Sequence, residues 1–148
     1  MYGMFANCYE LTQINVSNFV TSKVTDMMSM FFRCHKLTTL DLSNFDTSNV
    51  TTMYHMFYNC QALTTLDVSN FNTSNVTTML GMFDHCGNLT TLDLSSFDTS
   101  KVTNMEEMFL SSQKLTLIYV GPQWIINPNT STTNMFLYCG TSSVTLKP

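Results

Sequence analysis

Apolar and polar positions recur along this chain at intervals of 26 residues. The dipeptide Met-Phe returns together with its neighbours, at 4–5, 30–31, 56–57, 82–83 and 108–109. A fixed period of this length is typical of proteins in which successive turns of the chain stack and bury their apolar sides against one another. The pattern therefore predicts one continuous array of coils.

Each unit contains a stretch of alternating leucines that predicts a β-strand. In the segment Leu-Thr-Thr-Leu-Asp-Leu at 37–42, Leu40 and Leu42 alternate with Asp41. A period of two directs the leucines inward and Thr39 and Asp41 outward. Stacked in register, such strands predict a parallel sheet along one side of the array.

The other half of each unit has helical spacing. Apolar residues of the third unit lie at steps of three, three, one and three, at Val50, Met53, Met56, Phe57 and Cys60. This spacing is typical of one face of an α-helix. Thr51 is expected to cap this helix, and Thr103 with Glu106 form the pattern of a capping box in the fifth unit. Together the elements predict an α/β fold: a right-handed leucine-rich-repeat solenoid of about five coils, with a parallel β-sheet on one face and short helices on the other.

The last unit departs from the repeat. We expect a single domain over residues 1–148, with regular repeats over 1–114 and a divergent capping unit over 115–148. Trp124, with Ile125 and Ile126, is expected to cover the end of the core, and residues 143–147 to add a short edge strand.

The first unit has no matching cover. Met1 occupies the register of Met27, so we expect the chain to continue upstream, and we expect self-association through the uncapped N-terminal coil. Charge argues against two other kinds of partner. Only 11% of residues are charged and the net charge is -4, whereas nucleic-acid binding needs a clustered basic face. No apolar run approaches the roughly 18 residues of a membrane span, so we expect no membrane insertion.

Cysteines share one register, at Cys8, Cys34, Cys60 and Cys86. One interpretation is a ladder of metal ligands or disulfides; the favoured one is a small buried residue in each coil. Zinc sites need paired ligands a few residues apart, and no Cys-x-x-Cys is present. We expect no catalytic, cofactor or metal residue, and no enzymatic activity.

Two surfaces are candidates for protein binding. The first is the outward face of the strands, with a row of threonines and a row of aspartates: Thr39, Thr65, Thr91, Asp41, Asp67 and Asp93. Carboxylates this close repel one another, so the row could bind a divalent cation or a Lys/Arg-bearing partner. Alternatively, each carboxylate is solvated and accepts hydrogen bonds from flanking Ser and Thr.

The second surface lies on the expected helices. Positions occupied by Phe32, Tyr54 and Tyr58 vary between units while their neighbours stay constant. If these side chains point outward, they form an aromatic patch for a protein partner. The alternative is packing between adjacent helices.

One repeat, F-x-x-C-x-x-L-T-x-L-D-L-S-N-F-D-T-S-x-V-T-x-M at 31–53, resembles the BspA-like leucine-rich repeats of bacterial surface proteins. It is most similar to a subtype of 25–26 residues found as a domain of unknown function in lactobacilli, mycoplasmas and other low-GC bacteria. The resemblance covers nearly the whole chain.

The resemblance implies an extracellular protein at the cell surface or attached to the cell wall. It implies adhesion to host or neighbouring cells through a protein ligand, either a host matrix protein or another bacterial surface protein. A structural spacer that holds another domain off the cell wall is the alternative. An ice- or glycan-binding face on the threonine rows is a third hypothesis.

Overall fold

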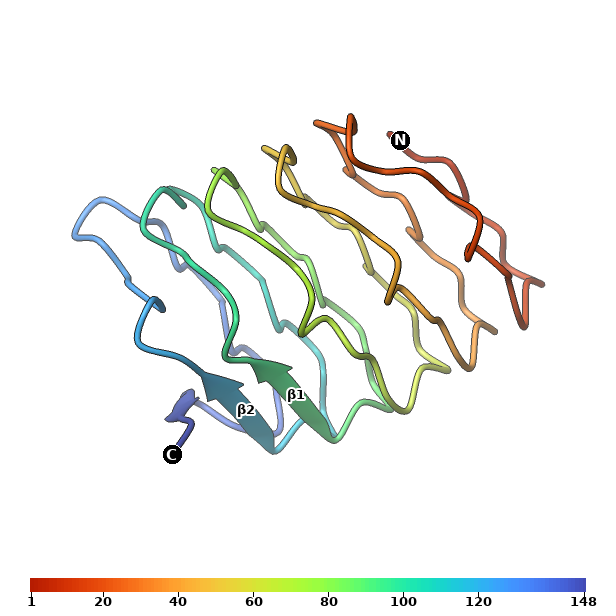
Figure 1. Cartoon of the computed structure of the whole chain (residues 1–148). Coiled ribbons are helices and arrows are strands. Elements are labelled where there is room, and N and C mark those ends of the chain that lie inside the picture. Colours follow the sequence, from red (N-terminus) through yellow and green to blue (C-terminus); the bar gives the residue numbers. More distant parts are fainter.

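The computed structural model describes residues 1–148 as a series of chain turns that lie side by side (Figure 1). Each turn, here called a coil, contains one Met-Phe segment, and the coils are numbered one to six from the N-terminus. Backbone hydrogen bonds connect equivalent parts of neighbouring coils. The N–H of Phe31 donates to the carbonyl of Met56, 25 positions further on, at 2.9 Å, and the equivalent bond recurs at every junction, with a separation of 26 at the last.

Three short strands form one parallel sheet at the C-terminal end. They are β1 (Thr91–Leu94), β2 (Leu117–Val120) and β3 (Thr145–Leu146), in the order β1-β2-β3. β3 confirms the edge strand expected at 143–147. The prediction of a sheet along the whole array is wrong, because the equivalent segments of coils one to three contain no strand.

The charge pattern of the outward face differs between the sheet and the coils before it. Asp93 faces the neutral side chain Tyr119 in the paired strands β1 and β2. On its other side lies Asp67, whose pKa is lowered chiefly by its hydrogen bonds with Ser69, while repulsion from Asp93 and Asp41 opposes this only slightly. Like charges opposite one another destabilise strand pairing. Charge alone does not set the end of the sheet, however, because coil one has the neutral Asn15 at the position equivalent to Asp41 and no strand forms there.

The structure contains no α-helix, so the predicted α/β solenoid with short helices on one face is wrong. The Met-Phe segments consist of consecutive turns with two left-handed residues in each coil, four positions apart, such as Ser29 (φ 55°) and Arg33 (φ 59°). A left-handed residue cannot continue a right-handed helix. Short bonds such as Met30 N–H to the Met27 carbonyl close the turns.

The capping roles expected for two threonines are also wrong. The hydroxyl of Thr51 donates to the carbonyl of Thr25, and that of Thr103 to the carbonyl of Thr77. Glu106 instead accepts a hydrogen bond from the hydroxyl of Ser131 in the next coil. These side chains connect coils and do not begin helices.

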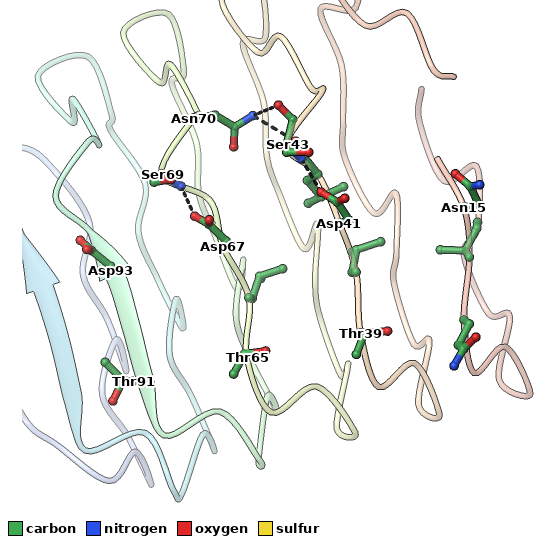
Figure 2. Close-up of a pocket in the computed structure, with 15 residues that line it drawn as sticks. Asn15, Thr39, Asp41, Ser43, Thr65, Asp67, Ser69, Asn70, Thr91 and Asp93 are labelled. Carbon is green, nitrogen blue, oxygen red and sulfur yellow. Dashed lines mark hydrogen bonds between the residues drawn. The ribbon is translucent and has the colours of Figure 1, made fainter. Parts of the chain in front are cut away.

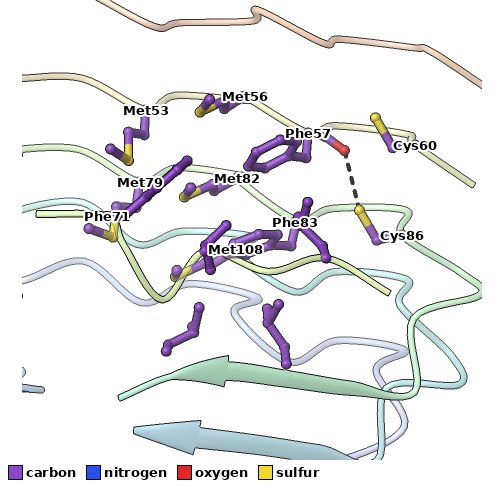
Figure 3. Packing of buried hydrophobic residues seen from close by; sticks show 14 of the residues in the cluster. Met53, Met56, Phe57, Cys60, Phe71, Met79, Met82, Phe83, Cys86 and Met108 are labelled. Carbon is purple, nitrogen blue, oxygen red and sulfur yellow. Dashed lines mark hydrogen bonds between the residues drawn. The ribbon is translucent and has the colours of Figure 1, made fainter. Parts of the chain in front are cut away.

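The apolar positions nevertheless point inward as predicted, into one core that runs the length of the array. Figure 3 shows part of this core. Leu42 is 1% exposed, and the Met-Phe methionines of coils two to five are fully buried. Phenylalanines of successive coils stack with nearly parallel rings; Phe31 and Phe57 have centroids 5.8 Å apart at 2°. Each coil thus buries its apolar side chains against the equivalent ones of its neighbours.

A row of buried threonines, not foreseen in the sequence, links the coils between the leucine segment and the Met-Phe segment of each unit. The Thr47 hydroxyl accepts a hydrogen bond from the N–H of Asn72 at 2.8 Å and donates to the carbonyl of the same residue at 3.0 Å. Thr21 and Thr73 make the same pair of bonds with the coils that follow them. A buried hydroxyl is satisfied in this way, and each coil is held in register.

The last unit covers the core only in part. Trp124 is half-buried and packs against the core, whereas Ile125 and Ile126 are 40% and 50% exposed. The expectation that all three cover the core is therefore wrong for the two isoleucines. No helix in the structure has the length and hydropathy that a membrane span requires.

Gly81 provides a test of the left-handed positions. Its φ is +56°, and an added Cβ would lie 2.3 Å from Cδ2 of His55. Gly3 has the same φ, but the nearest atom to its Cβ would be 3.7 Å away. We expect Gly3→Ala to lower the free energy of unfolding by about 1 kcal/mol through backbone strain alone, and Gly81→Ala to lower it by about 2 kcal/mol or more.

Urea unfolding would measure both losses. Adding His55→Ser to Gly81→Ala should recover the part of the stability loss that comes from the clash with the His55 ring. Serine fits at this position, since Ser29 occupies the equivalent position in coil two. Equal losses for the two alanine variants would contradict the steric argument.

Candidate functional site

Two rows of polar side chains form a shallow groove along the outward face of coils one to four (Figure 2). We call this groove the outer strip. It contains all six strand residues proposed for binding, Thr39, Thr65, Thr91, Asp41, Asp67 and Asp93. The structure brings these residues together as the sequence predicted, and whether they bind a protein stays a prediction.

The three aspartates are held in the same way. The N–H of Ser43 donates to Oδ1 of Asp41 at 2.9 Å, and Ser69 and Ser95 make the same bond to Asp67 and Asp93. These bonds lower the pKa of Asp41 and Asp67 below its usual 3.8, since they favour the charged form. The carboxylates are therefore ionised at neutral pH and fixed in direction.

A lysine of the chain itself already lies on this row. The ammonium of Lys147, which follows β3, forms an ion pair with Oδ2 of Asp93. This contact is the largest cause of the lowered pKa of Asp93. Asp41 and Asp67 have no such partner, because the other two ion pairs of the structure lie elsewhere. The row therefore accommodates a basic side chain at one position and leaves two carboxylates open.

The floor of the outer strip is apolar where the sheet is absent. Leu40 and Leu66 are each 8% exposed, whereas Leu92, at the same position within β1, is 1% exposed. The groove thus combines one row of carboxylates and one row of threonine hydroxyls with small apolar patches, a combination suited to an extended peptide carrying basic and apolar side chains.

The aromatic residues Phe32, Tyr54 and Tyr58 do not share a helix face, because no helix is present, but they do lie together across adjacent coils. Phe32 stacks on Tyr58 with ring centroids 4.7 Å apart, and Tyr54 stacks on the His55 ring at 4.0 Å. Each of the three is half-buried. We call these residues with His55 the turn-side patch; packing between coils accounts for its inner faces.

His55 is a member of this patch that sequence reasoning missed. Its ring lies 4.8 Å from that of Tyr58, and its Nε2 atom is buried without a hydrogen-bond partner. Burial lowers its pKa below the usual 6.5. Gly81 is the sequence signal that could have located it. It is the one glycine among the equivalent positions of coils two to five, and the His55 ring fills the space that a side chain at position 81 would occupy.

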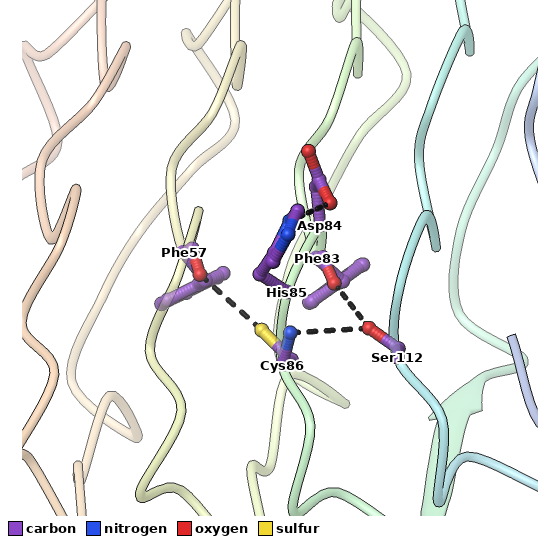
Figure 4. Close-up of polar contacts among 6 residues, drawn as sticks. All are labelled: Phe57, Phe83, Asp84, His85, Cys86 and Ser112. Carbon is purple, nitrogen blue, oxygen red and sulfur yellow. Dashed lines mark hydrogen bonds and ion pairs between the residues drawn. The ribbon is translucent and has the colours of Figure 1, made fainter. Parts of the chain in front are cut away.

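A buried carboxylate lies near the patch in coil four (Figure 4). Asp84 is 2% exposed, and its Oδ1 lies 2.6 Å from Nδ1 of His85. Burial raises the pKa of Asp84 to about 6, Glu107 adds to the rise, and the contact with His85 opposes it. The equivalent residues in the neighbouring coils are Tyr58 and Leu110. The sequence therefore showed this position as variable but did not show that its carboxylate is buried.

The cysteine register consists of free thiols. Cys34, Cys60 and Cys86 are buried, and each thiol donates to the carbonyl of a phenylalanine in the preceding coil at 3.2 Å. Burial raises the pKa of Cys34 to about 11 and that of Cys86 to about 12. In the fifth coil the hydroxyl of Ser112 takes the same place and donates to the Phe83 carbonyl (Figure 4). The buried-residue interpretation is confirmed for these three thiols.

No group of three or more His, Cys, Asp or Glu side chains in the structure could hold a metal ion. Comparison with models of known protein families identifies the family of the repeat. The model of the family described as "Mycoplasma protein of unknown function, DUF285" matches residues 1–67 and, in a second match, 35–146. The chain belongs to this family. No curated protein matches the chain, and no solved structure matches it.

Asp84 generates a prediction about pH. Its folded pKa of about 6 exceeds the ordinary 3.8, so the charged form costs stability above pH 6, and the cost disappears as pH falls below 3.8. We expect Asp84→Asn to raise the free energy of unfolding by on the order of 1–3 kcal/mol at pH 8 and to have little effect at pH 3.5.

Asp46→Asn is the control for this measurement. The pKa of Asp46 is lowered, chiefly by its hydrogen bonds with Ser48, so removal of its charge should reduce stability at pH 8. Urea unfolding at both pH values compares the two variants. A loss of stability at pH 8 for Asp84→Asn would contradict the raised pKa of Asp84.

The turn-side patch gives a second prediction. Replacing both Tyr54 and Tyr58 by Ser should lower the free energy of unfolding by about 1–3 kcal/mol, because ring stacking across coils is lost. Tyr138→Ser is the control, since Tyr138 is 69% exposed. Thermal unfolding followed by circular dichroism measures both. Unchanged stability of the double variant would show that the rings are free for a partner.

Proposed function

We propose that this chain is part of a bacterial cell-surface protein that binds a protein partner through the outer strip. Membership of a Mycoplasma family supports a bacterial source. The similarity of the repeat to the BspA-like repeats of bacterial surface proteins supports an extracellular location, at the cell surface or attached to the cell wall. Adhesion to host or neighbouring cells is the biological role that fits these two points.

The observation that carries the proposal is the ion pair between Lys147 and Asp93. It supplies an example, within the chain, of the contact that we propose for a partner. Asp41 and Asp67 are equivalent to Asp93, are fixed by the same backbone bond, and lack a cation. A partner segment with basic side chains in an extended conformation would occupy these two positions.

The partner class follows from the groove. Its carboxylates favour Lys and Arg, and its apolar floor at Leu40 and Leu66 favours alternating small apolar side chains. Because single exposed ion pairs contribute only about 0–1 kcal/mol, affinity depends on several coils acting together. A host matrix protein or another bacterial surface protein with a basic segment fits this description.

A structural spacer is the second candidate function. The regular backbone bonds at every junction favour it, since they make the array stiff along its length. A spacer needs no ligand, whereas an adhesin does. Pull-down with host matrix proteins therefore distinguishes the two: an adhesin retains a partner, and a spacer retains none.

Oligolysine peptide provides a direct test of the strip. We expect it to bind the chain at low salt, and Asp41→Asn with Asp67→Asn to weaken binding roughly two- to thirty-fold, as expected for the loss of two exposed ion pairs. Isothermal titration calorimetry measures the affinity. Oligoglutamate of equal length should not bind.

Asp46→Asn is the matched control for this test. Asp46 is an exposed aspartate that accepts the N–H of Ser48 at 3.0 Å, as Asp41 accepts that of Ser43, but it lies outside the groove. Its replacement should leave oligolysine affinity unchanged. Equal weakening by Asp46→Asn, or no binding by the unaltered chain, would contradict binding at the outer strip.

A further inference from the structure

A second pocket lies in the interior of the array, at the corner where the Met-Phe segments of coils three to five lead into the leucine segments. We call it the corner pocket. Its volume is about 330 Å³, within the range of small-ligand sites. The residues that line it are polar or glycine, and none is Lys, Arg, Asp or Glu: Gln61, His85, Gly87, Asn88, Ser111 and Gln113. None of them belongs to the outer strip, so the corner pocket is a separate site.

Gly87 opens this pocket because it has no side chain. The equivalent residues of the coils before and after are Gln61 and Gln113, whose long side chains are exposed. A Cβ added at Gly87 would meet no heavy atom within 4 Å, and its φ lies outside the left-handed region. Neither packing nor backbone conformation therefore requires glycine here. What glycine provides is an open space between two glutamines.

The ring of His85 is fixed from two sides. Its Nδ1 lies 2.6 Å from Oδ1 of the buried Asp84 (Figure 4), and the ring packs against that of Tyr58, with centroids 5.8 Å apart. When Asp84 is ionised, Nδ1 donates to it, and Nε2 of the neutral ring is an acceptor. Nε2 has no hydrogen-bond partner in the chain and is not buried. His85 therefore supplies a pre-oriented ring whose free nitrogen can accept a hydrogen bond from a ligand.

The other polar groups of the corner pocket also have hydrogen-bonding capacity to spare. The ammonium of Lys114 donates to Oδ1 of Asn88 at 2.7 Å, which holds this amide in place and leaves its Nδ2 free to donate. The side-chain amides of Gln61 and Gln113 and the hydroxyl of Ser111 make no hydrogen bond within the chain. Amides and hydroxyls both donate and accept. The lining therefore offers donors and acceptors without a formal charge.

This lining selects the chemical class of the ligand. No apolar side chain is present to cover a hydrophobic group, and no cationic side chain lines the pocket to pair with an anion. The carboxylate of Asp84, in contact with His85, also repels an anion. A neutral ligand rich in hydroxyls matches the lining, because each hydroxyl donates and accepts.

We propose that the corner pocket binds a neutral sugar. Its hydroxyls accept from Nδ2 of Asn88 and donate to Nε2 of His85, and the amides of Gln61 and Gln113 hold it from either side. Hydrogen bonds made in an open site contribute little net free energy, so we expect a dissociation constant on the order of 1 mM. The proposal does not rest on the function proposed for the outer strip, since the two sites share no residue.

Titration followed by two-dimensional NMR tests the proposal with the complete, isotope-labelled chain at neutral pH. The probes are glucose, galactose, mannose and N-acetylglucosamine, each as the free sugar and as its methyl glycoside. We expect at least one of them to shift the side-chain amide signals of Gln61, Asn88 and Gln113 with saturation. Binding of the glycoside would identify the ligand as the end of a glycan chain, and binding of the free sugar alone would identify a soluble sugar; both agree with the proposal.

Gly87→Gln fills the pocket with the residue that coils three and five have at the same position. It should weaken sugar binding about tenfold or more, measured on the Asn88 amide signal, and leave oligolysine affinity unchanged. Thr64→Gln is the matched control, since it adds the same side chain at an exposed position outside the corner pocket and should leave sugar affinity unchanged. Circular dichroism checks that each variant folds. If Gly87→Gln does not, Gln61→Ala with Gln113→Ala, which alters only exposed side chains, should weaken binding instead.

Three results would overturn the proposal. The first is the absence of any shift at sugar concentrations about a hundredfold above the expected dissociation constant. The second is a folded Gly87→Gln variant that binds the sugar as the unaltered chain does, which would place the contact elsewhere on the molecule. The third is a shift of the same amide signals by inorganic phosphate and by no sugar, which would indicate an anion site.

Discussion

The structure depends on backbone hydrogen bonds between coils. At each junction the N–H groups of three alternate residues donate to carbonyls 25 positions further along the chain, as Phe31 does to Met56, or 26 positions at the last junction. Each bond contributes about 0.5–1.5 kcal/mol net, and none is local, so a Met-Phe segment is stable only beside another one. This gain offsets the left-handed strain of about 1–2 kcal/mol at residues such as Arg33 and Glu107.

The sequence predicted the core and the outward rows because both follow directly from the periodic pattern. It could not distinguish a helix from consecutive turns, since both place Met27, Met30, Phe31 and Cys34 on one side. The distinguishing signal is conformational: Gly and Asn, which tolerate positive φ, occupy left-handed positions in several coils. Residues such as Arg33 occupy them in others and hide that signal.

The candidate site was predictable to a similar extent. The Asp and Thr rows repeat every 26 residues, so their alignment could be read from the sequence. The contact of Lys147 with Asp93 spans 54 positions and occurs once, and therefore leaves no periodic trace. The end of the sheet at β1 is equally hidden, because the segments of coils two and three have the same alternation of leucine and polar residues as β1 but form no strand.

Uniform and variable positions of the coil have different consequences for recognition. The outer strip presents the same carboxylate in three successive coils, so the basic partner that we propose would bind in several registers, and its affinity would increase with the number of coils it spans. Such a row cannot select one register. Selection requires exposed positions that differ between coils, and the turn side provides them, with the half-buried Phe32, Tyr58 and Leu110 at one equivalent position. A partner that contacts both sides would gain affinity from the first and specificity from the second.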